Sequence, residues 1–171
     1  TLVHEVDKPY RDHHAKSICV LNNGKDILFR SERTGWGHYY HYDGNGKLLN
    51  TITSGEWVAG NIVAIDTLKR TFYFYGYGKE KNINPYYYTL YRAHMDREGV
   101  TPIAVEDGQH NVDFLKSRRY FIDTYSKIDQ VPTIVLKDSN GKTVLNLAKP
   151  DISQALAKGW TAPENFKVKA A

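Results

Sequence analysis

Histidines and acids near the start of the chain are the first residues whose types suit chemistry. His4, Asp12, His13 and His14 are all metal-ligand types, and they lie in one short polar stretch. Adjacent side chains of an extended segment point to opposite faces, so His13 and His14 do not readily share one ion. We find no second cluster in the sequence that complements them. We therefore predict no metal site, and we expect no other cofactor.

A second group of reactive residue types lies between residues 31 and 41. Ser31, Glu32 and Arg33 have the types of a catalytic set, but they fall in a predicted loop between strands, where a structural role is the better interpretation. His38 and His41 are three residues apart in a predicted strand, which places them on opposite faces, as edge-strand histidines beside tyrosines. The Gly-x-Ser-x-Gly motif of a nucleophile elbow is absent from the sequence. We therefore predict no catalytic residue in this chain.

The elements that would carry these residues follow a pattern that occurs three times, once about every 45 residues. Residues 17–53 and 111–147 are the clearest pair of copies, each with two strands around a basic turn, then a polar loop and two more strands. The last turn is Asp43-Gly44-Asn45-Gly46-Lys47 in one copy and Asp138-Ser139-Asn140-Gly141-Lys142 in the other. Four short antiparallel strands per repeat are typical of β-propeller blades. The predicted fold class is all-β, a partial β-propeller of about three four-stranded antiparallel blades with one short C-terminal helix.

The repeats divide the chain into five predicted segments. These are the tail of a preceding propeller segment at 1–14, blades at 15–54, 55–108 and 109–150, and a short helix with a junction at 151–171. The helix is expected at Asp151–Lys158, because Asp151 can cap its start and Gly159 suits its left-handed exit. The chain begins at Thr1 rather than Met and stops within an extended pattern, so we expect it to be part of a longer protein.

The composition is that of an ordinary globular domain, with 41% hydrophobic and 25% charged residues. No run of about 18 apolar residues occurs, so we predict no membrane span. The net charge of +4 is mild, and Lys and Arg are scattered through turns, so we expect no nucleic-acid binding. Cys19 is the single cysteine and lies in an apolar strand, where we expect a small core residue.

Aromatic residues make up 13% of the chain and favour strands, where they cover a half-buried pleated surface. We predict strands at Arg70–Tyr75 and Tyr86–Tyr91 from their aromatic runs. Trp36 and Trp57 are expected to pack between neighbouring blades, each with its indole N–H hydrogen-bonded. The long charged loop Gly76–Pro85 is the best candidate for contact with a partner, because long loops on rigid scaffolds often carry function.

Two stretches are specific enough to suggest a family. They are Arg30-Ser31-Glu32-Arg33-Thr34-Gly35-Trp36-Gly37-His38, followed by Tyr39-Tyr40-His41-Tyr42-Asp43, and Ile52-Thr53-Ser54-Gly55-Glu56-Trp57-Val58 after the fourth strand. Together they resemble the N-terminal β-propeller of dipeptidyl peptidase IV-like serine peptidases, in the prolyl oligopeptidase clan. The resemblance continues through four further stretches, Tyr73–Tyr75, Leu90–Arg92, Asn111–Phe114 and Arg119–Ser126.

This resemblance implies the C-terminal part of a propeller that has eight blades in the family and caps an α/β-hydrolase domain. That domain carries a Ser-Asp-His triad, which would follow residue 171, and removes dipeptides from peptide N-termini after Pro or Ala. The family's paired glutamates, which bind the substrate's amino terminus, lie earlier in the propeller, and no Glu-Glu pair occurs here. Arg11, beside Tyr10, is the one substrate-binding candidate that the resemblance suggests, and the alternative is a solvent-exposed arginine on a linker.

The predicted function is therefore that of a propeller segment that gates and shapes the active-site cavity of an exopeptidase. Peptide substrates would reach the triad in the absent hydrolase domain, and the isolated segment would have no peptidase activity. The resemblance also implies a periplasmic or secreted location. The alternative is a non-enzymatic propeller that binds protein or carbohydrate partners. Three blades leave two open sides, so we expect the segment to self-associate through them.

Overall fold

Three four-stranded antiparallel sheets make up nearly all of the computed structural model, which describes residues 3, 18–164, 166 and 168–169. The first sheet contains β1 (Ile18–Leu21), β2 (Asp26–Ser31), β3 (His38–Asp43) and β4 (Leu48–Thr51). The second contains β5 (Val58–Asp66), β6 (Thr71–Tyr77), β7 (Thr89–His94) and β8 (Val100–Ala104). The third contains β9 (Gln109–Phe114), β10 (Tyr120–Lys127), β11 (Gln130–Asp138) and β12 (Thr143–Ala148). A short 3-10 helix, η1 (Asn22–Gly24), joins β1 to β2.

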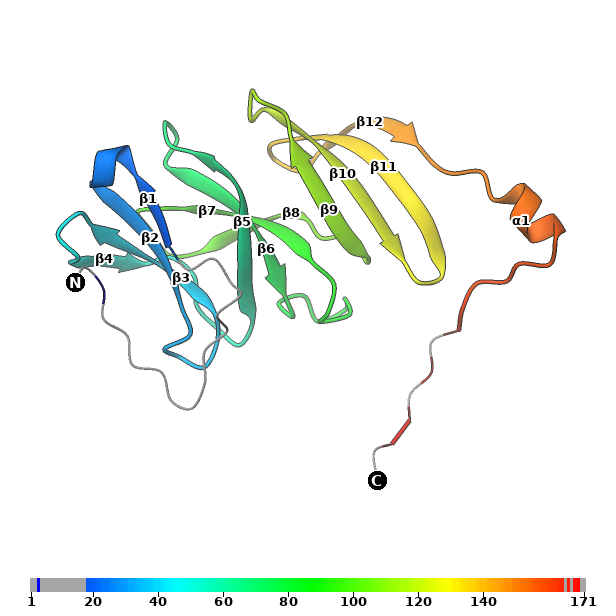
Figure 1. Ribbon diagram of the computed structural model, residues 1–171, viewed down its shortest axis with the longest axis horizontal. Helices are drawn as coiled ribbons and strands as arrows, with labels where there is room; N and C mark the ends of the chain where they lie inside the picture. Colours follow the sequence, from blue (N-terminus) through cyan, green and yellow to red (C-terminus); the bar gives the residue numbers. More distant parts are fainter. Residues whose placement is uncertain (1–2, 4–17, 165, 167, 170–171) are drawn as a thin grey trace.

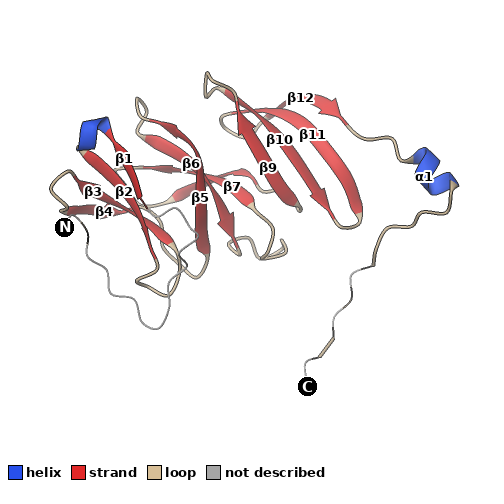
Figure 2. Ribbon diagram, in the orientation of Figure 1, coloured by secondary structure: helices blue, strands red, loops and turns tan. Residues whose placement is uncertain are grey.

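The sheets stand side by side along the chain, and each is a simple up-and-down meander (Figure 1). Strands dominate, and the one α-helix among the described residues, α1 (Ser153–Ala157), lies beyond the third sheet (Figure 2). It falls within the predicted Asp151–Lys158, and the side chain of Asp151 accepts a hydrogen bond from the backbone N–H of Ser153 at 2.9 Å. The predicted fold class is confirmed.

The repeated aspartate turns have the same hydrogen-bond pattern in the first and third sheets. Asp43 Oδ1 accepts from the backbone N–H groups of Asn45 and Lys47, both at 2.9 Å. Asp138 Oδ1 accepts from Asn140 and Lys142 at 2.9 and 3.0 Å. Each aspartate closes its own turn, as this residue does in Asx turns. The similarity that the sequence indicated is therefore a similarity of local structure.

One predicted strand is wrong at its first half. Tyr86–Tyr88 form a turn, and β7 begins only at Thr89. The Asn84 side chain accepts the N–H of Tyr86 at 3.0 Å, and the Asn84 carbonyl accepts that of Tyr87 at 2.9 Å. These local bonds compete with the sheet ladder, so the aromatic run does not extend the strand.

The central sheet packs against both neighbours, and β6 shows why. Phe72 and Phe74 point toward the first sheet, where they belong to a buried cluster with Tyr39 and Trp57. The alternate residue Tyr73 packs with residues of the third sheet in a separate cluster. Because side chains alternate along a strand, a strand with apolar residues at both parities is covered on both faces.

The outer strand of the third sheet is open. All six residues of β12 are exposed, including Val144, Leu145 and Leu147. The first sheet is not exposed in the same way. Its cluster of Ile27, Phe29, Tyr40 and Tyr42 is buried, and Val3 packs against it. Self-association through open sides stays a prediction. No helix in the described ranges is both long and apolar enough to cross a membrane.

Candidate functional site

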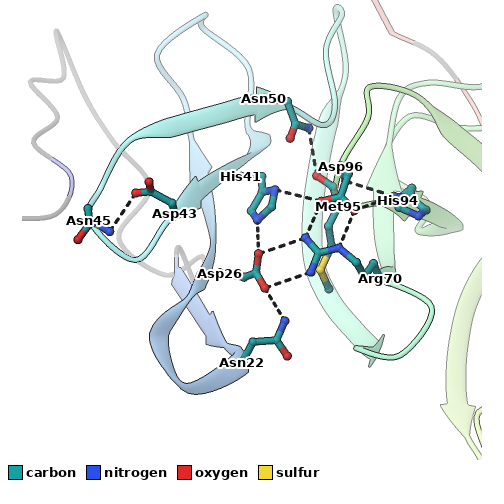
Figure 3. Close-up of polar contacts among 10 residues, drawn as sticks. All are labelled: Asn22, Asp26, His41, Asp43, Asn45, Asn50, Arg70, His94, Met95 and Asp96. Atoms are coloured by element: carbon teal, nitrogen blue, oxygen red, sulfur yellow. Dashed lines mark hydrogen bonds and ion pairs between the residues drawn. The ribbon is translucent and has the colours of Figure 1, made fainter.

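A cluster of charged side chains joins the first and second sheets (Figure 3). Arg70, in the turn between β5 and β6, donates from Nη1 and Nη2 to the two carboxylate oxygens of Asp26, both at 3.1 Å. Its Nε donates to Asp96 Oδ2 at 2.6 Å, and its Nη2 donates to the other oxygen of Asp96. The planar guanidinium forms a two-bond contact with each carboxylate, a fork geometry that an ammonium group lacks. The Arg70 side chain therefore links β2 of the first sheet to the β7–β8 turn of the second sheet.

His41 and Asn22 complete the environment of Asp26. His41 Nε2 lies 2.7 Å from Asp26 Oδ1, and the Asn22 side-chain amide donates to Asp26 Oδ2. His41 is buried, and its Nδ1 lies 3.6 Å from Asp96 Oδ1, beyond hydrogen-bond reach. The Asn22 and Arg70 contacts satisfy one carboxylate oxygen of Asp26, and His41 and Arg70 satisfy the other. A buried carboxylate with this many donors is held as the anion.

The electrostatic effect of Arg70 is visible in its partners. Its hydrogen bonds hold the pKa of the Asp26 carboxyl far below its usual range, against an opposing effect of burial. The pKa of Asp96 is lowered for the same reason. The two carboxylates in turn raise the pKa of the Arg70 guanidinium. The cluster is therefore a fixed ion network across a sheet interface rather than a proton-transfer group.

A second cluster lies in the third sheet and in the segment that links this sheet to the second. Lys137 of β11 and His110 of β9 are both fully buried, and both contact the buried carboxylate of Asp123 on β10 at 2.9 Å. The Lys137 ammonium also bonds Glu106, in the segment that links the two sheets. His110 Nε2 lies 2.9 Å from the Glu106 carbonyl, so both ring nitrogens face acceptors.

The second cluster also contains a metal-ligand set. One ligand atom each from Glu106, His110 and Asp123 lies within 4.8 Å of the others. The ammonium of Lys137 already contacts both carboxylates, so the cluster holds its own cation. Sequence reasoning missed this set because its members come from three separate elements. Its signal, an aspartate in the centre of an aromatic strand, appears only once burial is known.

The tryptophans behave differently from each other. Trp57 is buried, stacks with Phe74 at 6.3 Å between ring centroids, and donates its indole N–H to the Ser54 carbonyl at 2.7 Å. The predicted packing role is confirmed for it. Trp36 is 40% exposed in the loop before β3, so the same prediction is wrong there. A turn at Glu32–Gly35, closed by the Gly35 N–H to the Glu32 carbonyl at 2.8 Å, precedes this exposed indole.

The interpretation of His38 and His41 as edge-strand residues is wrong. Both are buried on β3, which pairs with β2 on one side and β4 on the other. His38 lies 2.8 Å from the Gly55 carbonyl through Nε2 and packs edge-on against Trp57. Burial lowers the pKa of His38. Its neutral ring therefore has a packing role.

The remaining candidate residues are tied into the scaffold or lie outside the described part. Arg11 and the early histidines lie outside the described residues. Arg33 donates to the Tyr42 hydroxyl at 2.7 Å and stacks over the Tyr40 ring, which supports a structural role for its loop. In the loop Gly76–Pro85, Glu80 accepts from the Tyr91 hydroxyl at 2.9 Å, so this loop is anchored to β7. Partner contact by the loop stays a prediction.

Comparison with known proteins gives a consistent family signal. The model of the dipeptidyl peptidase IV (DPP IV) N-terminal region matches residues 1–132. A probable dipeptidyl peptidase 4 of Trichophyton verrucosum is 28% identical over 109 residues, which is 60% of this chain and 14% of that protein. The dipeptidyl peptidase 4 of Trichophyton rubrum is also 28% identical over 109 residues, 13% of its length. The chain thus spans about a seventh of the curated relatives it matches.

A solved structure has the same fold over most of the chain. The crystal structure of dipeptidyl peptidase 4 from Porphyromonas gingivalis superposes with a TM-score of 0.65 at 22% identity. The superposition covers 84% of this chain and 19% of that one. At this sequence identity, the superposition shows a similar fold and nothing more.

Proposed function

Because this chain belongs to the family of dipeptidyl peptidase IV N-terminal regions, we propose that it works within a serine-type dipeptidyl peptidase. Its three sheets would form part of the propeller wall of that enzyme, which releases dipeptides after Pro or Ala from peptide N-termini. They would shape the active-site cavity and restrict entry to small peptides. The Ser nucleophile, the His base and the oxyanion hole would come from a hydrolase domain outside this chain.

The observation that carries this proposal is a pair of ion networks, one between the first two sheets and one between the third sheet and the segment that precedes it. A wall that excludes large substrates must keep its blades in register. Arg70 spans the interface of the first two sheets, and Lys137 ties the third sheet to Glu106 in the linking segment. Both neutralise carboxylates that burial would otherwise leave costly. Interfaces between domains are expected to move unless they are large and hydrophobic, and here apolar clusters also fill both sheet interfaces. The networks favour a rigid wall over a flexible one.

The proposal includes the division of the chain. Residues 15–54, 55–108 and 109–150 would be successive blades, and residues 151–171 would lead toward the hydrolase. The segment at 1–14, proposed as the tail of a preceding blade, lies outside the described residues except for residue 3. The parent would act in the periplasm or outside the cell.

The experiment compares the full-length parent with this chain on a Gly-Pro chromogenic dipeptide. We expect cleavage by the parent and none by the isolated chain, because no nucleophile elbow occurs in it. The gating role is tested in the parent with Arg70→Ala, which removes the contact between the first two sheets. We expect cleavage of long peptides to rise relative to the chromogenic dipeptide.

The matched control is Lys69→Ala, a neighbouring residue whose side chain is 68% exposed. It should leave the ratio of long to short substrate unchanged. A folded parent that does not cleave the dipeptide would reject the peptidase proposal and favour a binding propeller. An unchanged ratio in Arg70→Ala, with dipeptide cleavage retained, would reject the gating role alone.

A further inference from the structure

A cavity of about 370 Å³ opens between the inner strands of the first two sheets. Its walls are apolar, formed by residues such as Leu28 of β2 and Ile62 and Ala64 of β5, with Cys19 of β1 at one side. Cavities of this volume with apolar walls and a few polar groups are typical of small-molecule sites. The proposed role in a dipeptidyl peptidase gives this cavity no function, since that role needs only that the sheets stay in place.

One charged side chain from residues 18–164 lines this cavity, that of Arg118 from the β9–β10 turn of the third sheet. Among the described residues, its guanidinium has no ion-pair partner. In the part of the chain that the structure describes, no carboxylate belongs to the cavity lining. The cavity therefore combines an apolar wall with a single available cation, and this favours an apolar ligand that ends in an anionic group.

The backbone at Arg118 gives an independent observation. Its φ is 56°, in the left-handed region that a residue with a side chain adopts only at a cost. The first sheet has Gly24, with φ of 86°, in the corresponding turn, and the second has Arg70, with φ of 52°. The Arg70 side chain there holds two carboxylates. An arginine at a position that suits glycine indicates a use for its side chain.

We propose that this cavity binds a small apolar carboxylate of the fatty-acid type. The alkyl chain would lie between the first two sheets against Leu28 and Ile62. The carboxylate would accept hydrogen bonds from the Arg118 guanidinium at the cavity rim, and this fork geometry suits a carboxylate. The third sheet would thereby contact a ligand held by the other two, and binding would link all three.

Cys19 makes the proposal directly measurable. It is the only cysteine of the chain and it lines the cavity, so a ligand in place covers the thiol. Burial raises the pKa of Cys19, and alkylation is therefore compared at one fixed pH. The probe is N-ethylmaleimide, an uncharged reagent, and the readout is the rate of single addition by intact-mass spectrometry. The competing ligands are octanoate, octanol and octylammonium, which share one alkyl chain.

We expect octanoate to slow the alkylation of Cys19 at least threefold, and octylammonium to leave the rate unchanged. Arg118→Gln should raise the octanoate concentration for half-protection about tenfold, because a charge-assisted bond is lost. Arg118→Gly repeats the test with a residue that suits the left-handed backbone, so a folding defect is kept separate from loss of binding. Lys116→Gln, an exposed neighbour outside the cavity lining, is the matched control and should keep full protection.

Three results would overturn the proposal. One is equal protection by octylammonium and octanoate, which would indicate binding by the alkyl chain alone. Another is unchanged octanoate protection in a folded Arg118→Gly variant. The last is no protection by octanoate at any concentration below its micelle threshold. Dipeptidyl peptidase activity of the parent plays no part in these outcomes, so the two proposals fail separately.

Discussion

Replacement of Arg70 by alanine is the most direct test of how the sheets are held together. Four hydrogen bonds to Asp26 and Asp96 are lost, and the two carboxylates are left near each other beside His41. The backbone at Arg70 keeps its φ of 52° in the alanine variant, so strain at this position is retained. The measured change therefore reports the lost ion network.

The expected loss of unfolding free energy follows from how deeply each carboxylate partner of Arg70 is buried. Asp26 is 8% exposed, and removal of one partner from a buried ion pair costs about 3–5 kcal/mol. The side chain of Asp96 is 41% exposed, and pairs at such positions contribute about 0–1 kcal/mol. Because Arg70 is itself one-third exposed, water can replace part of its contact with Asp26. We therefore expect the free energy of unfolding to fall by about 2–4 kcal/mol.

The pH dependence has a definite sign. The pKa values of Asp26 and Asp96 are lowered in the folded chain, chiefly by Arg70. Their stabilisation is therefore fully present above the unfolded-state pKa, about 4, and is lost as the pH falls through the folded-state values. The difference between wild type and Arg70→Ala should shrink between about pH 5 and pH 2.

Urea unfolding at pH 7 and pH 3, followed by tryptophan fluorescence, measures the loss of unfolding free energy and its dependence on pH. Lys69→Ala is the control and should change the unfolding free energy by less than about 0.5 kcal/mol. Arg70→Gly should recover about 1 kcal/mol relative to Arg70→Ala, because glycine relieves the left-handed backbone. A loss below about 0.5 kcal/mol in Arg70→Ala, or an equal loss at both pH values, would refute the reasoning.

Three further changes test the packing of the sheets by urea unfolding. Lys137→Met leaves two carboxylates without their ammonium, and one of these carboxylates is fully buried. We expect the free energy of unfolding to fall by about 3 kcal/mol, and a fall below about 1 kcal/mol would contradict the ion network. Phe72→Ala opens a cavity in the cluster between the first two sheets and should cost about 3–5 kcal/mol, while a cost near zero would mean that this interface is not packed. Gly141→Ala places a Cβ 2.1 Å from the Ile103 carbonyl oxygen at φ of 88°, and it should cost clearly more than Gly24→Ala, which has open space at φ of 86°. An equal loss of unfolding free energy in the two glycine variants would show that backbone strain, and not the contact with Ile103, sets the cost at Gly141.

Local patterns in the sequence determined much of the fold. The Asp-x-Asn-Gly-Lys turns at residues 43–47 and 138–142 use hydrogen bonds within five residues, so their structure follows from their own side chains. Strand positions were also predictable from aromatic and β-branched runs, except at Tyr86–Tyr88. There, Asn84 forms a turn that propensity for strand does not anticipate.

The polar clusters were not predictable in the same way. Asp26 and Arg70 are 44 residues apart, and each is an ordinary charged residue next to a turn in the sequence. Asp123 lies among apolar residues of β10, and only the approach of β11 and of the linking segment supplies Lys137 and Glu106. The packing of the sheets decides which charged side chains form ion pairs, because an ion pair requires closeness in space and not in sequence.

The sequence by itself determined the repeat, the turn chemistry, the fold class and a resemblance to one peptidase family. These depend on interactions between residues close in the chain, or on the order of motifs along it. Only the tertiary structure decided that Trp57 is buried while Trp36 is exposed, that Arg70 joins two sheets, and that Arg118 lines a cavity formed mainly by the other two. Burial and ion pairing are properties of packed faces, and a face exists only when distant strands come together.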